Sequence, residues 1–180
     1  MDPVNLREIQ RPLRKAYREE PERAKVTLRA RGSQLDGNLM ACSVDIGRAL
    51  VAAQAHPGVG GPGTGACSGD LLLAGLAGCA QITAQLVAEA VGLRWRWLEV
   101  HVEGDLDLRG TLGVSQDVPV GFTGIRLRIE IDSDASAEEL EAFQRKVEQY
   151  CVVLATLRQP PEIETSLVRV AAPAEARPGA

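Results

Sequence analysis

The chain has 180 residues, of which 45% are hydrophobic and 24% charged, so it can bury a substantial core and we expect one domain with flanking tails. A formal net charge of −4 and only 3% aromatic residues argue against a nucleic-acid-binding surface, which needs basic patches and stacking platforms. The N-terminal residues lack the apolar core of a secretory signal, and Gln81, Gln85 and Glu89 interrupt the longest apolar run, so we expect a cytoplasmic protein that does not span a membrane.

The first 24 residues form a charged segment that Pro12 and Pro21 interrupt. Charged runs are usually solvated and each proline opposes a continuous helix, so we expect one or two short helical pieces on the surface. The alternative is an arm that wraps around a second subunit. Because the last residues are small, polar and Pro-rich, the chain divides into a charged arm (1–24), a folded domain (25–171) and a disordered tail (172–180).

Strand-like segments dominate the predicted domain. Apolar and polar residues alternate in KVTLRAR (25–31) and in TGIRLRIEID (123–132), a pattern typical of half-buried strands. Three further strands are expected at 39–46, 97–108 and 162–170. Together these segments predict a largely antiparallel sheet with one face exposed to solvent.

Two helices are expected between the strands. The first covers 68–92, with Ser68 as a good N-cap and Asp70 in the first turn, where a negative charge suits the helix dipole. The second runs from Ser136 to Arg158 and opens with Ser136 and Glu139 at the spacing of a capping box. The order of strands, helix, strands, helix and strand predicts an α+β fold.

A glycine-rich segment, residues 52–69, leads into the first helix. It lacks the Gly-Lys-Ser/Thr ending of a nucleotide-binding loop, so we do not expect a phosphate site there. The favoured interpretation is a flexible loop that borders a pocket.

The chain contains four cysteines, Cys42, Cys67, Cys79 and Cys151. In a reducing compartment they would be free thiols. Cys67 lies in the glycine-rich segment, where it could be an incidental exposed thiol, and Cys42 lies in a strand-like run, which favours a core position.

Cys79 and Cys151 both lie on apolar helix faces. At about 100° per residue, Cys79 shares a face with four apolar residues, Leu72, Leu76, Ile82 and Leu86. Gln81 and Gln85 fall on the far side of the same helix. Cys151 continues the apolar stripe of the second helix, so both thiols are expected to point towards one interior. Free cysteine packs like a small hydrophobe, and periodicity alone therefore favours a packing role for both.

A thiol that attacks a peroxide must first ionise, and an apolar pocket opposes this by raising the thiol pKa. Arg29, Arg31 and Arg48 are candidate cations to stabilise the thiolate, although an arginine on a strand is more often solvated. The attack yields a sulfenic acid, which a second thiol can capture as a disulfide. His56 and His101 lack metal-ligand spacing to the cysteines, so no metal site is expected.

Four segments are distinctive in combination: GDLLLAGLAGCAQIT, GDLDLRGTLGV, VGFTGIRLRIEIDSDAS and VEQYCVVLATLRQPPEIETSL. From about Val26 to Val170 the chain resembles the OsmC/Ohr family of osmotically inducible and organic hydroperoxide resistance proteins. The resemblance implies an OsmC-like α+β fold, with a mostly antiparallel sheet and two central cysteine-bearing helices. It also implies an intertwined homodimer with its active sites at the subunit interface.

The resemblance implies that Cys79 is the peroxidatic cysteine and Cys151 the resolving one, in an enzyme that reduces organic hydroperoxides without a metal or bound cofactor. A dithiol such as a lipoyl group would then reduce the disulfide. Peroxidase members carry a glutamate where this chain has Gly69, and Asp70 follows it. Asp70 either substitutes imperfectly for that glutamate or serves only as a charge at the helix start. The alternative function is a non-peroxidase dimer that binds a small apolar ligand at its interface, with structural or redox-sensing thiols.

Overall fold

The structure is a computed structural model that describes residues 5–35 and 38–169. In chain order its elements are α1 (Leu6–Glu19), the 3-10 turn η1 (Pro21–Ala24), β1 (Arg31–Leu35), β2 (Asn38–Asp45), β3 (Leu50–Gln54), the 3-10 turn η2 (Pro57–Val59), α2 (Ser68–Val91), β4 (Trp97–Leu106), α3 (Leu108–Thr111), β5 (Phe122–Asp132), α4 (Ala137–Tyr150) and α5 (Val152–Arg158). The predicted tail, 172–180, lies outside the described residues.

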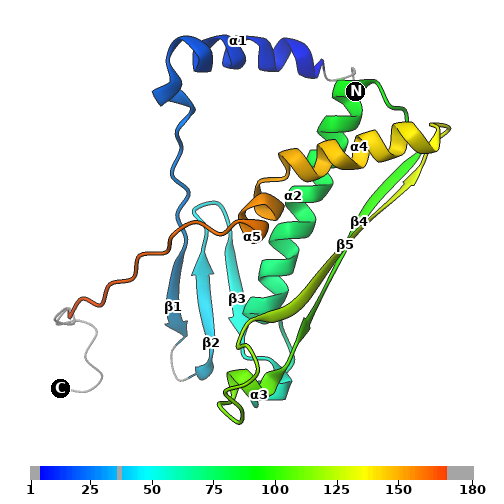
Figure 1. The fold of residues 1–180 in the computed structure, drawn as a ribbon. Helices are drawn as coiled ribbons and strands as arrows, with labels where there is room; N and C mark the ends of the chain where they lie inside the picture. The colour runs from blue at the N-terminus through cyan, green and yellow to red at the C-terminus, as the bar shows by residue number, and fades with distance from the viewer. Residues whose placement is uncertain (1–4, 36–37, 170–180) are drawn as a thin grey trace.

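The body of the molecule is built around α2. The antiparallel ribbon of β4 and β5 runs along one side of this helix, and α4 and α5 pack against it as well (Figure 1). Most of the buried side chains form two clusters along α2. One consists of Ala84, Val87, Ala88, Phe143 and Val147, and the other of Leu76, Ala80 and Cys151.

The β4–β5 ribbon has the two-faced character that its alternation predicts. Val100 and Leu127 pack towards α2, whereas the opposite face carries ion pairs such as that of Arg126 with Asp105 and Glu103. A second antiparallel sheet, in the order β1-β2-β3, lies beside the lower part of α2 in Figure 1. The α+β class and the antiparallel pairing are therefore confirmed, but the strands form two sheets rather than one.

Two predicted strands are wrong for this chain. Of the segment 25–31 only Arg31 lies in a strand, and Val26 and Leu28 are 80% and 91% exposed. The described part of 162–170 has no secondary structure, and Leu167 is fully exposed. Alternation makes a segment suitable for a sheet, but a strand also needs a neighbour for its backbone N–H and C=O groups, and neither segment has one here.

Other boundaries also differ from the predictions. β3 occupies the start of the segment that we expected to be entirely loop, because its backbone pairs with β2 from Ala41 to Asp45. The N-cap of α2 is Cys67 rather than Ser68. The predicted second helix is not continuous: Cys151 adopts an extended conformation (φ −74°, ψ 105°) and separates α4 from α5. By contrast, α1 continues through Pro12 and ends before Pro21.

The buried face of α2 is turned relative to the prediction. Ile82 and Leu86, expected to face inward, are 59% and 41% exposed, and Leu72 is also exposed. Gln81, expected on the far side, instead donates from Nε2 to the carbonyl of Leu98, 3.1 Å away. By length and composition α2 could cross a membrane, but this is weak evidence because the core helix of a globular protein passes the same test.

Candidate active site

The structure brings Cys79 and Cys151 into contact. Their Sγ atoms are 3.5 Å apart, both thiols are free, Cys151 is fully buried and Cys79 is half-buried. A disulfide has an S–S length of about 2.0 Å, so only a small displacement of the two side chains separates this arrangement from a bonded one. The two thiols therefore face one interior, as predicted. Cys79 lies on α2, but Cys151 lies at the junction of α4 and α5 rather than within an unbroken second helix.

The break between α4 and α5 places Cys151. Its extended conformation ends α4, where its N–H still donates to the carbonyl of Val147, and caps α5, where its carbonyl accepts the N–H of Ala155. No side chain caps the first turn of α5. The first backbone N–H groups of a helix have no partner within it, so those of Val152 and Val153 are available to another acceptor.

These N–H groups act on the pKa of the nearby Cys79 thiol. Burial raises the pKa of the Cys79 thiol, but hydrogen bonds from the backbone of Val153, the thiol of Cys151, the backbone of Val152 and the side chain of Thr83 outweigh it. The pKa of Cys79 therefore lies below that of an ordinary thiol. Hydrogen bonds donated to a thiolate favour the ionised form, which is the reactive one.

The pKa of the Cys151 thiol is raised, in contrast to that of Cys79. Burial is the main cause that raises its pKa, and the neighbouring Cys79 adds to this effect. Cys151 consequently stays protonated while Cys79 ionises, and its S–H donates to the Cys79 sulfur. Interacting groups titrate as a pair, and this environment makes Cys79 the first of the two to lose its proton.

The sequence left the role of Asp70 at the start of α2 undecided, and in the structure its carboxylate is engaged within the first turn of that helix. Oδ2 of Asp70 accepts the N–H of Cys67 at 2.8 Å, and the backbone and thiol of Cys67 lower the pKa of Asp70. A Cβ added at Gly69 would lie 3.4 Å from Cζ of Phe122. At 1.5 Å of rise per residue, Asp70 is roughly 13 Å from Cys79 along the helix axis, so its carboxylate does not contact the thiol.

The three candidate arginines are not among the groups that act on Cys79 in the described residues. Arg29 and Arg48 are exposed, and Arg31 lies 4.0 Å from Asp45 at the far end of β2. Of the other two cysteines, Cys42 is half-buried in β2 and Cys67 is half-buried at the start of α2.

Neither histidine is part of this site. His56 accepts the N–H of Gly58 in the loop after β3, and His101 lies on the charged face of the ribbon, 3.5 Å from Glu130. Within residues 5–35 and 38–169 there is no group of three or more His, Cys, Asp or Glu side chains that could hold a metal ion.

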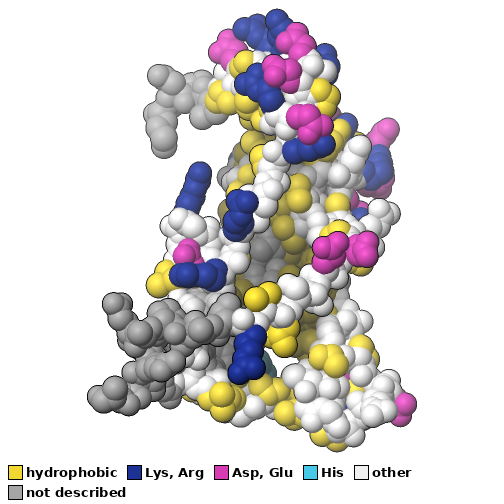
Figure 2. All heavy atoms as spheres, turned by 90° about the vertical axis from the view of Figure 1, so that its left-hand side faces the viewer, with side chains coloured by type: hydrophobic (Ala, Val, Ile, Leu, Met, Phe, Trp, Pro, Cys, Tyr) yellow, Lys and Arg dark blue, Asp and Glu magenta, His cyan; other side chains and the backbone are white. Residues whose placement is uncertain are grey.

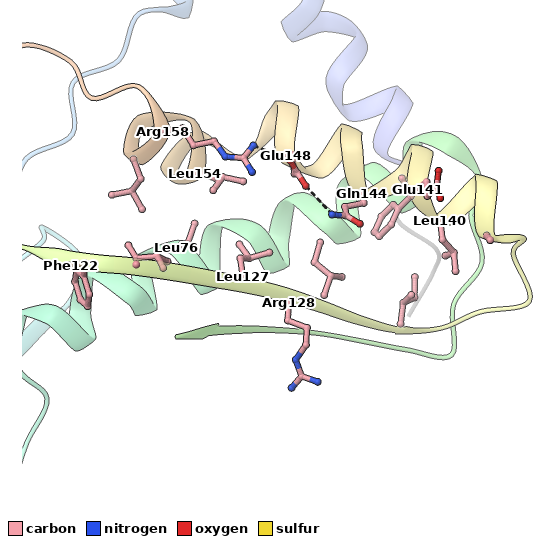
Figure 3. Close-up of a pocket in the computed structure, with 17 residues that line it drawn as sticks. Leu76, Phe122, Leu127, Arg128, Leu140, Glu141, Gln144, Glu148, Leu154 and Arg158 are labelled. Carbon is pink, nitrogen blue, oxygen red and sulfur yellow. Dashed lines mark hydrogen bonds and ion pairs between the residues drawn. The ribbon is translucent and has the colours of Figure 1, made fainter. Parts of the chain in front are cut away.

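A groove of about 800 Å³ lies next to the cysteine pair, between β5, α4 and α5. Figure 3 shows leucines from α2, β5 and α5 along it, and Leu76 and Leu154 belong to the buried cluster that contains Cys151. Glu148 accepts hydrogen bonds from Gln144 and Arg158 on its α4–α5 side. The glycine-rich segment does not line this groove, so its place beside a pocket stays a prediction. The signal that sequence reasoning missed is the end of α4 at Cys151.

A family model described as OsmC-like protein matches residues 61–166, more than half of the chain. The chain belongs to the OsmC-like protein family. The matched segment contains both contacting cysteines and the groove beside them, and it begins after α1 and the β1–β3 sheet.

Solved structures of OsmC-like proteins have the same fold. An OsmC-like protein from Mycoplasma pneumoniae is 23% identical with a TM-score of 0.64, over 76% of this chain and 90% of that one. An organic hydroperoxide resistance protein from Elizabethkingia anophelis is 18% identical with a TM-score of 0.60, over 76% and 91%. One from Legionella pneumophila is 19% identical with a TM-score of 0.59, over 74% and 90%. No curated protein matches the sequence. At these identities the structural likeness shows the fold.

Proposed function

We propose that this OsmC-like chain is a thiol-dependent peroxidase that reduces organic hydroperoxides in defence against oxidative stress. The observation that carries the proposal is the contact of Cys79 with Cys151 at 3.5 Å, together with pKa shifts of opposite sign in the two thiols. Cys79 is the peroxidatic residue and Cys151 the resolving one. Two relatives of the same fold are described as organic hydroperoxide resistance proteins, which supports this substrate class.

The reaction balances in two steps. The Cys79 thiolate attacks the terminal peroxide oxygen, the O–O bond breaks, and the alkoxide leaves with a proton as the alcohol, so that Cys79 becomes a sulfenic acid. The Cys151 sulfur then attacks the Cys79 sulfur, and water leaves as the disulfide forms. The Cys79 thiolate has given two electrons to the peroxide, and a dithiol such as a lipoyl group returns two electrons by thiol–disulfide exchange.

The proposed enzyme is an intertwined homodimer. One face of α2 carries a row of exposed small and apolar residues, Leu72, Gly75, Ile82, Leu86 and Ala90, and half-buried Cys79 lies in the same row. An added Cβ at Gly75 would meet nothing within 4 Å. A second copy that covers this row would exclude water from the thiol, and it could also pair with the segments 25–30 and 161–169, which have no strand partner within one chain.

The proposed homodimeric peroxidase also has expected domain limits, a cellular location and a role for Asp70. The dimer-forming domain is 25–171, the arm is 1–24 and the tail is 172–180. The cytoplasm is the proposed location, because its reducing conditions regenerate the dithiol form. Asp70 is a helix-start charge rather than a catalytic acid, since its carboxylate is engaged by Cys67.

A second candidate function is supported by Gly69 and by the groove. Without the glutamate of the peroxidase members, the dimer would bind a small apolar molecule in the 800 Å³ groove, and its thiols would be structural or redox-sensing. Apolar cavities of this size commonly hold small ligands.

Peroxide consumption distinguishes the two candidates. Reduced wild type mixed with cumene hydroperoxide should consume about one equivalent and lose two thiols per chain, and a dithiol should sustain turnover. Cys79→Ser should consume none, while Cys42→Ser, a matched substitution of another half-buried cysteine, should behave as wild type. A wild type that leaves the peroxide and all its thiols intact would refute the peroxidase and favour the binding protein.

A further inference from the structure

α1 is an amphipathic helix whose apolar side its own chain does not cover. No residue of α1 is buried, and Ile9, Leu13 and Tyr17 are 56%, 46% and 42% exposed. These three residues are four apart, so they lie on one face of the helix. A surface helix normally buries such a stripe against a core. The exposed stripe indicates that the surface it packs on belongs to another molecule.

The position of α1 leaves space for that molecule. The extended segment 25–30, which pairs with no strand, holds α1 away from the β1–β3 sheet and can span about 20 Å. α1 contacts α2 and runs across the top of the molecule in Figure 1. Figure 2, which shows the left-hand side of Figure 1, has hydrophobic side chains on α1 and in the hollow beneath it. The stripe of α1 and the exposed row on α2 that includes Ile82 and Leu86 are therefore both left uncovered by their own chain.

The charge of α1 favours a second copy of this chain as the partner. α1 carries five basic and two acidic residues, which leaves the rest of the chain with 15 basic against 22 acidic ones. A positively charged arm is therefore attracted to the negatively charged body of another copy.

We infer that α1 is a clasp that lays Ile9, Leu13 and Tyr17 on a second copy of the chain, beside the exposed row of its own α2. The inference rests on the proposed homodimer and adds to it an interface that lies outside the matched family segment, residues 61–166. In a two-fold dimer each copy contributes one clasp, so a substitution in α1 acts twice on the same equilibrium.

The test compares two double variants of the full chain. Ile9→Gln with Leu13→Gln removes the apolar stripe, and Arg7→Lys with Arg11→Lys changes the opposite face of the same helix while keeping its charge and a similar helix propensity. The dissociation constant of the dimer is measured by sedimentation over a dilution series. The stripe variant should raise it about tenfold or more, and the control by less than about threefold. In wild type, hydrogen exchange of the α1 amides should slow as protein concentration rises.

Three results would overturn the clasp. The wild type could be a monomer at all concentrations, or the stripe variant could dissociate like wild type although circular dichroism shows its helices intact. The stripe variant could also lose binding to phosphatidylserine vesicles while its dimer is unchanged, which would assign the stripe to a membrane. Peroxide consumption is measured in parallel: a stable dimer that needs α1 but consumes no peroxide refutes the peroxidase alone, and a monomer that consumes peroxide refutes the clasp and the homodimer but not the peroxidase.

Discussion

The start of α2 and the start of α5 are both capped by a cysteine, yet they direct their backbone N–H groups to different acceptors. At α2, the carboxylate of Asp70 accepts the N–H of the N-cap, Cys67. At α5, no side chain caps the first turn after Cys151. The backbone N–H groups of Val152 and Val153 instead lower the pKa of the Cys79 thiol. When a side chain of the same helix accepts the first backbone N–H groups, the bond stabilises that helix. When no side chain accepts them, these N–H groups can stabilise a neighbouring anion.

The groups that lower the pKa of Cys79 do not include residues at the start of α2. This chain has Gly69 there, and the sequence left open whether Asp70, the next residue, substitutes imperfectly for the glutamate that the resemblance implies or serves only as a helix-start charge. The groups that lower the pKa of Cys79 instead come from the α4–α5 junction and from Thr83, one turn along α2. Substitutions at the junction should therefore alter thiol chemistry, and substitutions at the start of α2 should alter stability.

The largest effect is expected for Cys151→Ser. The Cys79 sulfenic acid would then have no neighbouring thiol, so it should persist and be trapped nearly quantitatively by dimedone, whereas oxidised wild type should give little adduct. Mass spectrometry after one equivalent of cumene hydroperoxide measures the adduct on Cys79. Cys67→Ser serves as the control, since Cys67 is a half-buried thiol outside the pair. Equal trapping in wild type and Cys151→Ser would show that Cys151 does not resolve the intermediate.

The next effect concerns the pH dependence of alkylation. Because the pKa of Cys79 is lowered, its reaction with iodoacetamide should reach half-maximal rate at a lower pH than that of an unperturbed thiol. Cys151→Ala removes one of the donors to the sulfur, so the midpoint should move upward while the backbone donors keep part of the shift. Cys151→Ser retains a hydroxyl donor and should fall between the two. An unchanged midpoint in Cys151→Ala would remove the Cys151 thiol from the activation of Cys79.

The contrast between the two helix starts was only partly predictable from sequence. Periodicity located α2, the β4–β5 ribbon and a common interior for the two cysteines. It did not locate the break at Cys151, because the apolar spacing continues through residues 147–157 without a Gly or Pro to interrupt it. The break depends on tertiary packing of Cys151 against Leu76 and Ala80, which no local signal encodes.

The buried face of α2 and the two strands absent from the described residues also differ from the sequence predictions, because both depend on packing rather than on local pattern. α2 has apolar residues on most of its circumference, so its hydrophobic pattern could not fix which face this chain covers and which it leaves to solvent. The segment 25–31 alternates as a strand does and the segment 162–170 is also predicted to be a strand, but pairing partners are a property of the whole fold and not of the segment. The position of the cysteine pair follows from pattern, and its chemical environment follows from packing.

A smaller effect is expected for Asp70→Asn. Loss of the charge that accepts the Cys67 N–H should lower the free energy of unfolding by about 0.5–1 kcal/mol near neutral pH, with peroxide consumption unchanged. The folded-state pKa of Asp70 is lowered, so its contribution is fully present above the unfolded value of about 3.9 and is lost as pH falls through the lower folded value. Urea unfolding at neutral and acidic pH should show the two proteins converge in acid. A large loss of peroxidase activity with normal stability would instead make Asp70 part of the reaction.

A small effect on activity is also expected from Gly69→Glu, which introduces the acid that the resemblance to peroxidases implies at this position. A Cβ fits at this position, 3.4 Å from the Phe122 ring, and replacing a helical glycine should raise stability by about 0.5–1 kcal/mol. If the α4–α5 junction activates Cys79, peroxide consumption should change less than about twofold, because the new carboxylate starts about 15 Å from the thiol along α2. Gly69→Gln controls for side-chain bulk without charge. A rate increase confined to the glutamate variant would show that the two helix starts act together on Cys79 and that the natural chain lacks half of that device.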